Sequence, residues 1–314
     1  MTSSTLAPAG SRTARPGRGR SRRVGLGQSA WAPWIFVAPF LIIFGVFTLV
    51  PLVSSFAMSF TDFKATDVQS PFGVNFVGLD QYISLFGNAQ FLHSLGNTAY
   101  FVLVGIPLTM IVALALAVAL NNGIRRFRAV FRVGFYVPVV CSIVAISTGW
   151  RFILQDDGPL NGVLALVGIH GPDWLNSTTW AMPAIIVMAA WRNVGTLMII
   201  FLAGLQAVPA EVQEAGMMDG AGAWKRFTAI TLPILRPTIL LGSVLISVGY
   251  LQFFEEAFVM TGGGPLDSTL SITYFIYKQF GFGQYGLASA ASYLLFIVIA
   301  LVSVIQFRTL RSQD

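Results

Sequence analysis

Three ionisable residues of this 314-residue chain lie inside long apolar segments, where a charge is costly and therefore informative. Arg192 is near the middle of the apolar stretch 180–208, and Glu255 and Glu256 lie toward the end of the stretch 237–260. An unpaired charge at the centre of a bilayer costs from about 2.5 kcal/mol upward. We therefore expect Arg192 either to pair with one of these glutamates as a structural ion pair or to line a polar path for a solute.

Aromatic and amide side chains flank these charges. A sugar presents apolar C–H faces and a rim of hydroxyls, so an aromatic platform with amide or charged groups suits it. The plainer alternative is that each aromatic ring packs in the core. The candidate solute-pathway residues are Trp191, Arg192, Asn193, Tyr250, Gln252, Phe253, Phe254, Glu255 and Glu256.

The segment 211–237, EVQEAGMMDGAGAWKRFTAITLPILRP, is the interior stretch that mixes charge and pattern most densely. Good helix formers over 210–218, followed by Gly220 and Gly222, predict a short helix and a tight turn. A second short helix is predicted over 224–230, ended by Pro233 and Pro237. Two short helices at an angle would form an exposed knob, although a solvated connector between membrane spans is the plainer alternative.

This segment also carries a spaced motif. Glu214-Ala215-Gly216, Gly220 and Ile230-Thr231-Leu232-Pro233 fit the EAA motif E-A-A-x3-G-x9-I-x-L-P, with Gly216 where the motif has Ala. The segment resembles the signature cytoplasmic loop of the membrane subunits of binding-protein-dependent ABC importers. The stretches LAGLQAVP and TGGGPLDST are similar to those of its carbohydrate-uptake branch, the maltose and glycerol-3-phosphate type of permease.

The resemblance implies a type I importer permease with six transmembrane helices. Its partners would be a second permease in a heterodimer, two ATP-binding subunits and an extracytoplasmic solute-binding protein. ATP and Mg would be bound by the partner ATPase, with no cofactor in this chain. The residues implied to couple to the ATPase are Glu214, Ala215, Gly216, Asp219, Gly220, Ile230, Leu232 and Pro233. Because Gly216 should loosen the docking helix by about 0.5 to 1 kcal/mol, Gly216→Ala is expected to keep or tighten ATPase association.

Three alternatives to a sugar importer remain open at this stage. One is a secondary transporter driven by an ion gradient through Arg192 and Glu255. Another is a structural or receptor-like membrane protein without transport. The third is an ABC permease for a solute that is not a carbohydrate.

Composition places the chain in a membrane. Hydrophobic residues make up 55% of it and charged residues 10%, with a mean hydropathy of +0.73, whereas soluble proteins have about 25% charged residues. A membrane span needs about 20 apolar residues. The stretches that qualify are 31–60, 97–120, 132–154, 180–208, 237–260 and 287–307. We expect an all-α, multi-pass protein of a bacterial or archaeal cell membrane, in contact with lipid.

Charge asymmetry orients these spans. Fifteen of the 19 Lys and Arg residues lie in the two terminal segments, in the loop 121–132 and in the segment 211–237. By the positive-inside rule these parts are cytoplasmic, including both termini. We expect a disordered basic tail over 1–30, a permease domain over 31–307 with its coupling loop at 208–237, and a cytoplasmic tail over 308–314. Arg22-Arg23 also resembles a twin-arginine export signal, but the following uncharged run is too long for a cleaved signal.

Several functions are excluded or disfavoured. The sequence contains no G-x-x-x-x-G-K-[ST], so we expect no ATPase site in this chain, which is a transport subunit and not an enzyme. The run 281–286 fits G-x-G-x-x-G, but no strand is predicted before it. One cysteine precludes an intrachain disulfide, two histidines argue against a metal site, and the basic charge gathers at membrane loops rather than on a nucleic-acid surface. On the outer side we expect a surface helix over 77–91, a loop over 158–180 and a turn at 262–265.

Overall fold

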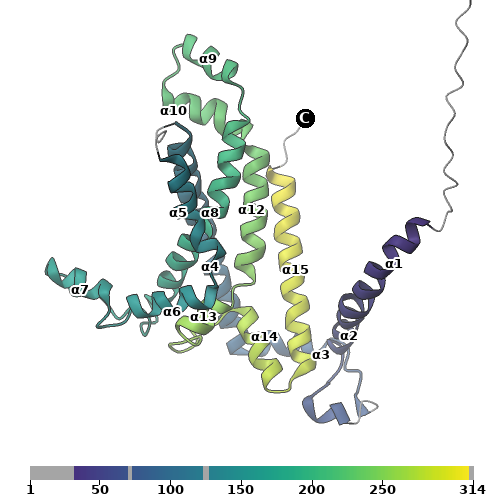
Figure 1. Ribbon diagram of the computed structural model, residues 1–314. Coiled ribbons are helices and arrows are strands. Elements are labelled where there is room, and N and C mark those ends of the chain that lie inside the picture. Colours follow the sequence, from purple (N-terminus) through teal and green to yellow (C-terminus); the bar gives the residue numbers. More distant parts are fainter. Residues whose placement is uncertain (1–31, 70–72, 123–126, 311–314) are drawn as a thin grey trace, which may run out of the picture. The chain divides into compact units, whose positions relative to one another are not determined.

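The computed structural model describes residues 32–69, 73–122 and 127–310, and these residues are helices joined by turns (Figure 1). Among them the only β-type pairing is an isolated bridge between Thr61 and Phe76. The expected all-α class is therefore confirmed. The predicted tail over 1–30, together with Arg125, Arg126 and 311–314, lies outside the described residues.

The helices are short at both ends of the bundle and long between them. Their bounds are α1 Ala32–Phe44, α2 Val50–Met58, α3 Asp80–Gly87, α4 Ala89–Asn122, α5 Arg128–Val140, α6 Ile143–Ile153, α7 Pro159–Leu166, α8 Ala181–Gln206, α9 Ala210–Met218, α10 Ala223–Arg226, α11 Leu232–Ile234, α12 Arg236–Leu251, α13 Glu255–Met260, α14 Ile272–Gly281 and α15 Tyr285–Leu310. Single π-helical turns, η1 Gly45–Leu49 and η4 Phe227–Thr231, continue α1 into α2 and α10 into α11, and η2 Ala65–Gln69 is a 3-10 turn.

The chain divides into two compact units, Met1–Pro51 and Leu52–Asp314. In the first unit, the side chains described from Trp34 onward are all exposed or half-buried. A helix that is apolar all round and buries nothing within its own unit has the character of a membrane span.

The second unit is built around α8. This helix packs against α4, α5 and α12, while α15 packs against α12 and α14. Large side chains fill the space between them, among them Phe101 of α4, Phe201 of α8 and Phe275 of α14, each at most 1% exposed. Figure 1 shows α9 and α10 at one end of this unit and α6, α13 and α14 at the other.

Four helices in the described part of the chain are long and apolar enough to cross a membrane. They are Trp34–Met58, Ala89–Asn121, Ala181–Gln206 and Tyr285–Thr309. Two bent helix pairs bring the number to six if each pair makes one span: Arg128–Val140 with Ile143–Ile153, bent by 100°, and Ala223–Ile234 with Arg236–Leu251, bent by 69°. The chain is thus a multi-pass membrane protein.

The structure corrects the third and fifth predicted spans, which are not continuous helices. In 132–154 the helix stops at Val140, just after Pro138, and the extended backbone of Cys141 lets α6 leave at a sharp angle. In 237–260 the helix stops at Leu251 and resumes at Glu255. The interruption lets Phe253 turn into the core, where it stacks on Phe101 with ring centroids 4.0 Å apart.

Other corrections concern the segments between spans. The predicted loop over 158–180 contains α7, which begins with Pro159 in its first turn, the helical position that proline tolerates best. The predicted surface helix over 77–91 is α3 followed by the start of α4. The helix α14 was not predicted at all, and 281–286 forms the turn that joins it to α15.

Candidate functional site

The segment 208–237 forms the projecting knob that its sequence predicts. Helix α9 ends where Gly220 takes a left-handed conformation, with φ of 72°. The backbone N–H of Ala221 then donates to the carbonyl of Gly216 at 2.9 Å, which satisfies the helix end. The second helix is longer than predicted, since it passes through Pro233 and continues to Ile234 as α10, η4 and α11.

Two contacts join the halves of the knob. The Gln213 side-chain amide donates to Thr231 Oγ1 at 2.8 Å. Gly216 is buried, and a Cβ atom built on it would lie 2.7 Å from Ile230 Cδ1. The motif therefore places Gly216 against Ile230. The expected effect of Gly216 on helix strength stays a prediction, and the structure adds that a side chain at 216 would require the end of Ile230 to shift.

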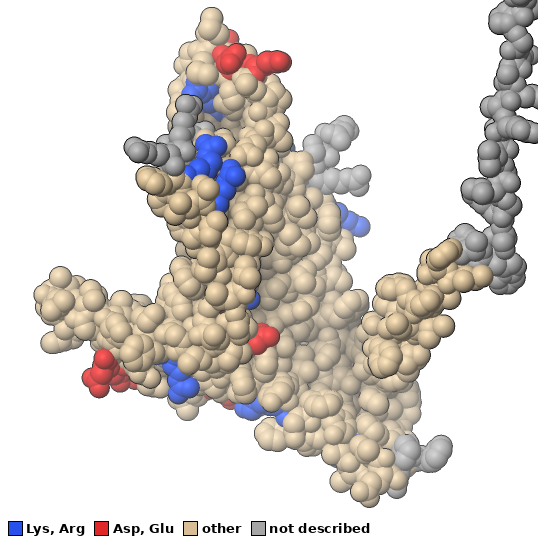
Figure 2. Space-filling model, in the orientation of Figure 1, with Lys and Arg blue, Asp and Glu red and all other residues tan. Residues whose placement is uncertain are grey.

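The outward face of the knob is acidic and apolar. Glu214, Ala215, Asp219 and Gly220 are exposed, whereas Leu232 is half-buried and Pro233 is exposed near the bundle. Figure 2 shows acidic groups at the tip of this end and basic groups nearer the bundle. Sequence reasoning missed Met218 and Trp224, which are 89% and 76% exposed. Two adjacent methionines just before a glycine turn were the available signal.

The intramembrane candidates fall into two groups. Tyr250 and Phe253 are each 3% exposed and belong to the core, where the Tyr250 hydroxyl shares a 2.7 Å hydrogen bond with Thr109 Oγ1. The Asn193 amide is used within α8, because it donates to the carbonyl of Ala189 at 2.8 Å. These residues meet the plainer expectation of packing.

The remaining candidates surround Arg192 and Glu256, two charged side chains that each have one buried atom without a hydrogen-bond partner. Arg192 is half-buried, and its buried Nε has no hydrogen-bond partner; Glu256 is 6% exposed, and the same holds for its Oε2. Within the described ranges the only ion pair closer than 4.0 Å joins Lys278 and Asp267, so Arg192 is paired with neither Glu255 nor Glu256 here. Arg192 and Glu256 therefore do not form a close ion pair, and both the solute path and a longer-range structural interaction stay predictions.

Exposed groups border this pair of charges. Trp191 is 46% exposed, and Gln252 and Glu255 are exposed beside the break between α12 and α13. Phe254 is half-buried within an aromatic cluster that includes Phe258. Trp150 of α6, which sequence reasoning missed, lies 5.7 Å from Trp191 between ring centroids. Only the fold brings α6 to this position.

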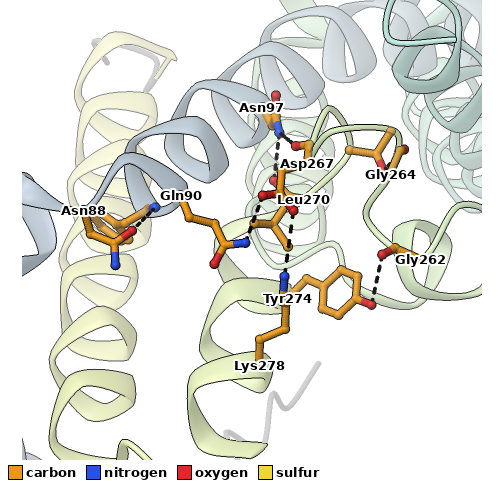
Figure 3. A network of polar contacts seen from close by, with 11 residues as sticks. Asn88, Gln90, Asn97, Gly262, Gly264, Asp267, Leu270, Tyr274 and Lys278 are labelled. Atoms are coloured by element: carbon orange, nitrogen blue, oxygen red, sulfur yellow. Dashed lines mark hydrogen bonds and ion pairs between the residues drawn. The ribbon is translucent and has the colours of Figure 1, made fainter. Parts of the chain in front are cut away.

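At the opposite end from the knob, the loop 261–271 is fixed by a polar network. Figure 3 shows Gln90 and Asn97 of α4 directed at Asp267. Gln90 Nε2 donates to Asp267 Oδ2 at 2.9 Å, and Asn97 Nδ2 donates to the carbonyls of Asp267 and Leu270 at 2.7 and 3.0 Å. Lys278 Nζ lies 3.8 Å from Asp267 Oδ1. The network holds Leu266 with 90% of its surface exposed.

No family model matches the chain, but individual proteins do. The lactose transport system permease protein LacF of Rhizobium radiobacter is 34% identical over 286 residues, covering 89% of this chain and 94% of that protein. The arabinooligosaccharides transport system permease protein AraP of Bacillus subtilis is 33% identical over 294 residues, covering 90% and 92%.

A solved structure shares the fold. A bacterial ABC transporter involved in the import of the acidic polysaccharide alginate contains a chain that superposes with a TM-score of 0.73, at 24% identity, over 90% of this chain and 95% of that one. Similarity to LacF and AraP extends over nearly their whole length. The resemblance to the permeases of carbohydrate ABC importers is therefore confirmed. The chain belongs to the permease subunits of ABC importers, which are transport components without an ATPase site of their own.

Proposed function

We propose that this chain is a permease subunit of an ATP-driven importer for sugars or sugar-like solutes, in a bacterial or archaeal cell membrane. The observation that carries this proposal is the 34% identity to a lactose permease over 94% of its length. In the proposed complex it forms half of the translocation pathway with a second permease. Two separate ATP-binding subunits, which hold ATP and Mg, and an extracytoplasmic solute-binding protein complete the assembly.

The proposed topology has six spans, both termini in the cytoplasm and the knob facing the ATPase. The bent pair α5–α6 counts as one span in this scheme and α12 as another, with α10 and α11 belonging to the knob. It follows from the charge asymmetry, since Lys225, Arg226 and Arg236 belong to the knob and its base. The domain limits are those of the sequence: a tail over 1–30, a permease domain over 31–307 and a tail over 308–314.

The proposed coupling surface consists of the exposed residues of the motif together with Met218 and Trp224. Glu214 and Asp219 supply charge. Met218 and Trp224 are apolar side chains whose exposure to water is unfavourable, so they would serve as apolar contacts with the ATPase. Gly216, Ile230 and Leu232 hold the halves of the knob together. Movement of the ATPase would shift the knob as one body, because Gln213 and Gly216 both lock α9 to η4.

The knob joins α8 directly to α12, so its movement reaches the pathway. Leu235, 1% exposed at the junction with α12, anchors the base of the knob in the bundle. Trp191, Arg192 and Glu255 line the proposed path on those helices and on α13, with Gln252, Phe254 and Glu256 beside them. The knob, moving between two positions, would then link the ATP site of the partner to the solute path in this chain. Coupling between two sites requires such a two-state element.

Reconstitution tests this function. The chain is purified with its second permease and ATPase, inserted into proteoliposomes, and given the solute-binding protein with labelled lactose, maltose or arabinotriose. Uptake of at least one sugar is expected, and only with ATP. Uptake that follows an ion gradient without ATP would restore the secondary-transporter alternative, and ATP-driven uptake of a solute that is not a carbohydrate would correct the substrate class.

A further inference from the structure

A cavity of about 450 Å³ lies beyond the intramembrane charges, at the end of the unit opposite the knob. Its size falls within the range of about 300–1,000 Å³ that is usual for small-molecule sites. Three parts of the fold enclose it: the end of α6, the turn 173–176 before α8, and the end of α13 with the turn that follows. The wall residues that bear on its chemistry are Arg151, Gln155, Asp156, Asp173, Asn176 and Phe258.

The polar side of the cavity is made of carboxylate, amide and guanidinium groups. Each of these can form two hydrogen bonds, to two neighbouring hydroxyls. A carboxylate has two acceptor oxygens, an amide has both a donor and an acceptor, and a guanidinium has a fork of donors. Asp173 is fixed in place, because its Oδ1 accepts from the backbone N–H and the side-chain amide of Asn176 at 3.0 and 3.2 Å.

These charges do not neutralise one another by pairing. Arg151, Asp156 and Asp173 line the same cavity, yet none forms an ion pair within 4.0 Å among the residues that the structure describes. Desolvation, and then the charge and a side-chain hydrogen bond of Asp173, raise the pKa of Asp156. The cavity therefore offers a ligand the donor groups of Arg151 and acceptor oxygens of Asp156 and Asp173.

The other side of the cavity offers an aromatic surface. Phe258 is 43% exposed. Its ring is supported from behind by Phe254 and Tyr274, at centroid distances of 5.3 and 5.5 Å. A fixed aromatic wall opposite paired hydroxyl ligands matches the two faces of a sugar ring.

The cavity continues toward the proposed pathway. On α6, Arg151 lines the cavity while its neighbour Trp150 contacts Trp191. On α13, Phe258 lies about one turn beyond Glu255. The two short helices pack against each other, so the cavity and the tryptophan pair lie on the same pair of elements.

We propose that this cavity is an outer saccharide-binding subsite, which receives sugar units before they enter the intramembrane path. This inference rests on the proposed function, and it adds a second sugar contact that is separate from Arg192 and Glu255. The alternative occupant is a loop of the solute-binding protein.

Protection of an engineered cysteine tests the subsite. Cys141 is the only cysteine, so Cys141→Ser leaves a background without thiols. Asn176→Cys then places one thiol in the cavity wall, and Asp157→Cys places one on an exposed neighbour outside it. Each assembled complex is labelled in proteoliposomes with an impermeant maleimide, with and without whichever of lactose, maltose or arabinotriose the wild-type complex imports.

Sugar at a concentration equal to its Kd for the subsite occupies half of the sites. It is therefore expected to slow the labelling of the cavity thiol about twofold and to leave the labelling of the control thiol unchanged. Equal labelling with and without sugar overturns the subsite. Protection by sugar-free binding protein, but not by sugar alone, also overturns it and assigns the cavity to that protein. Because the Asn176 side chain also holds Asp173, Gln155→Cys on the same wall is labelled in parallel. Equal labelling of that thiol with and without sugar counts against the subsite even if Asn176→Cys fails to assemble. Failure of the wild-type complex to import any sugar is a separate result that rejects the proposed function.

Discussion

The knob formed by α9–α11 and the loop 261–271 lie at opposite ends of the second unit. Both hold an apolar side chain in an exposed position, but different contacts fix them. Each presents an exposed apolar side chain, Met218 at 89% and Leu266 at 90%. Each also turns through left-handed backbone, but Gly220 does so without strain, whereas Leu266 and Asp267 do so at φ of 49° and 59°.

The difference lies in what holds each region. The knob is two helical segments packed together, and it is fixed mainly within itself through Gln213 and Gly216. The loop 261–271 is fixed to α4 and α14 by side chains, and non-glycine residues at positive φ cost about 1–3 kcal/mol each. A self-contained knob can move as one piece, while a loop braced from outside keeps its position on the bundle.

The largest expected effect comes from reversing a charge on the knob. Glu214→Arg places a cation where the proposed ATPase contact expects an anion, and association is predicted to weaken at least about tenfold. Co-purification of the ATPase and ATP-driven uptake both measure it. Asp157→Arg, which reverses a charge at the opposite end, is the control and should leave association unchanged. Normal association of Glu214→Arg would remove Glu214 from the coupling surface.

Removing the brace of the loop 261–271 should instead affect stability. Asn97→Ala deletes two hydrogen bonds and leaves carbonyls of Asp267 and Leu270 without that donor. The expected loss in unfolding free energy is about 1–3 kcal/mol, measured by thermal unfolding in detergent. Gln90→Ala removes one hydrogen bond instead of two and should cost less. Equal effects of the two variants would show that Asn97 is not the central brace.

A smaller effect is expected inside the knob. Gly216→Ala gains about 0.5–1 kcal/mol of helix stability but crowds Ile230, and overpacking costs about 1–3 kcal/mol. We therefore expect a net loss of about 1 kcal/mol and weaker ATPase association. This reverses the expectation from helix strength alone, which was an equal or tighter association. Ile230→Val removes the crowding atom, so the double variant should recover. A Gly216→Ala variant as stable as wild type, with no response to Ile230→Val, would contradict this packing account.

The smallest effect concerns a second brace at the end opposite the knob. Hydrogen bonds from the side chain and backbone of Asn75 lower the pKa of Asp62. A lowered pKa means that the contribution to stability is present at neutral pH and is lost as the pH falls through the folded-state value. Asn75→Ala should raise the pKa of Asp62 toward its ordinary range, as followed by NMR titration. Asn176→Ala, at a different turn, should leave it unchanged.

The two regions also differ in how far their sequence predicts them. The knob was predicted as two short helices with a turn at Gly220, because helix formers, glycine and motif spacing all lie within one short segment. For 261–271 only the turn was predicted. Its braces come from Gln90 and Asn97, far away in the chain, and no local pattern reports such contacts.

The intramembrane residues show the same division. Hydrophobic length located the apolar stretches that contain Arg192 and Glu255, and charge counting predicts a side for the loops. Neither pattern distinguished Tyr250 and Phe253, which are core, from Trp191 and Gln252, which are exposed. That distinction depends on which face of each helix meets a neighbour, and aromatic residues suit both environments.

By itself, the sequence determined that the chain is a membrane protein, where its apolar stretches lie, and that 211–237 carries the importer motif. These are properties of composition and local spacing, which each segment holds alone. The tertiary structure alone decided that two spans break, that Gly216 faces Ile230, and that α6 and α13 meet around a cavity. Those outcomes depend on packing between residues distant in the chain, where one close contact outweighs local helix preference.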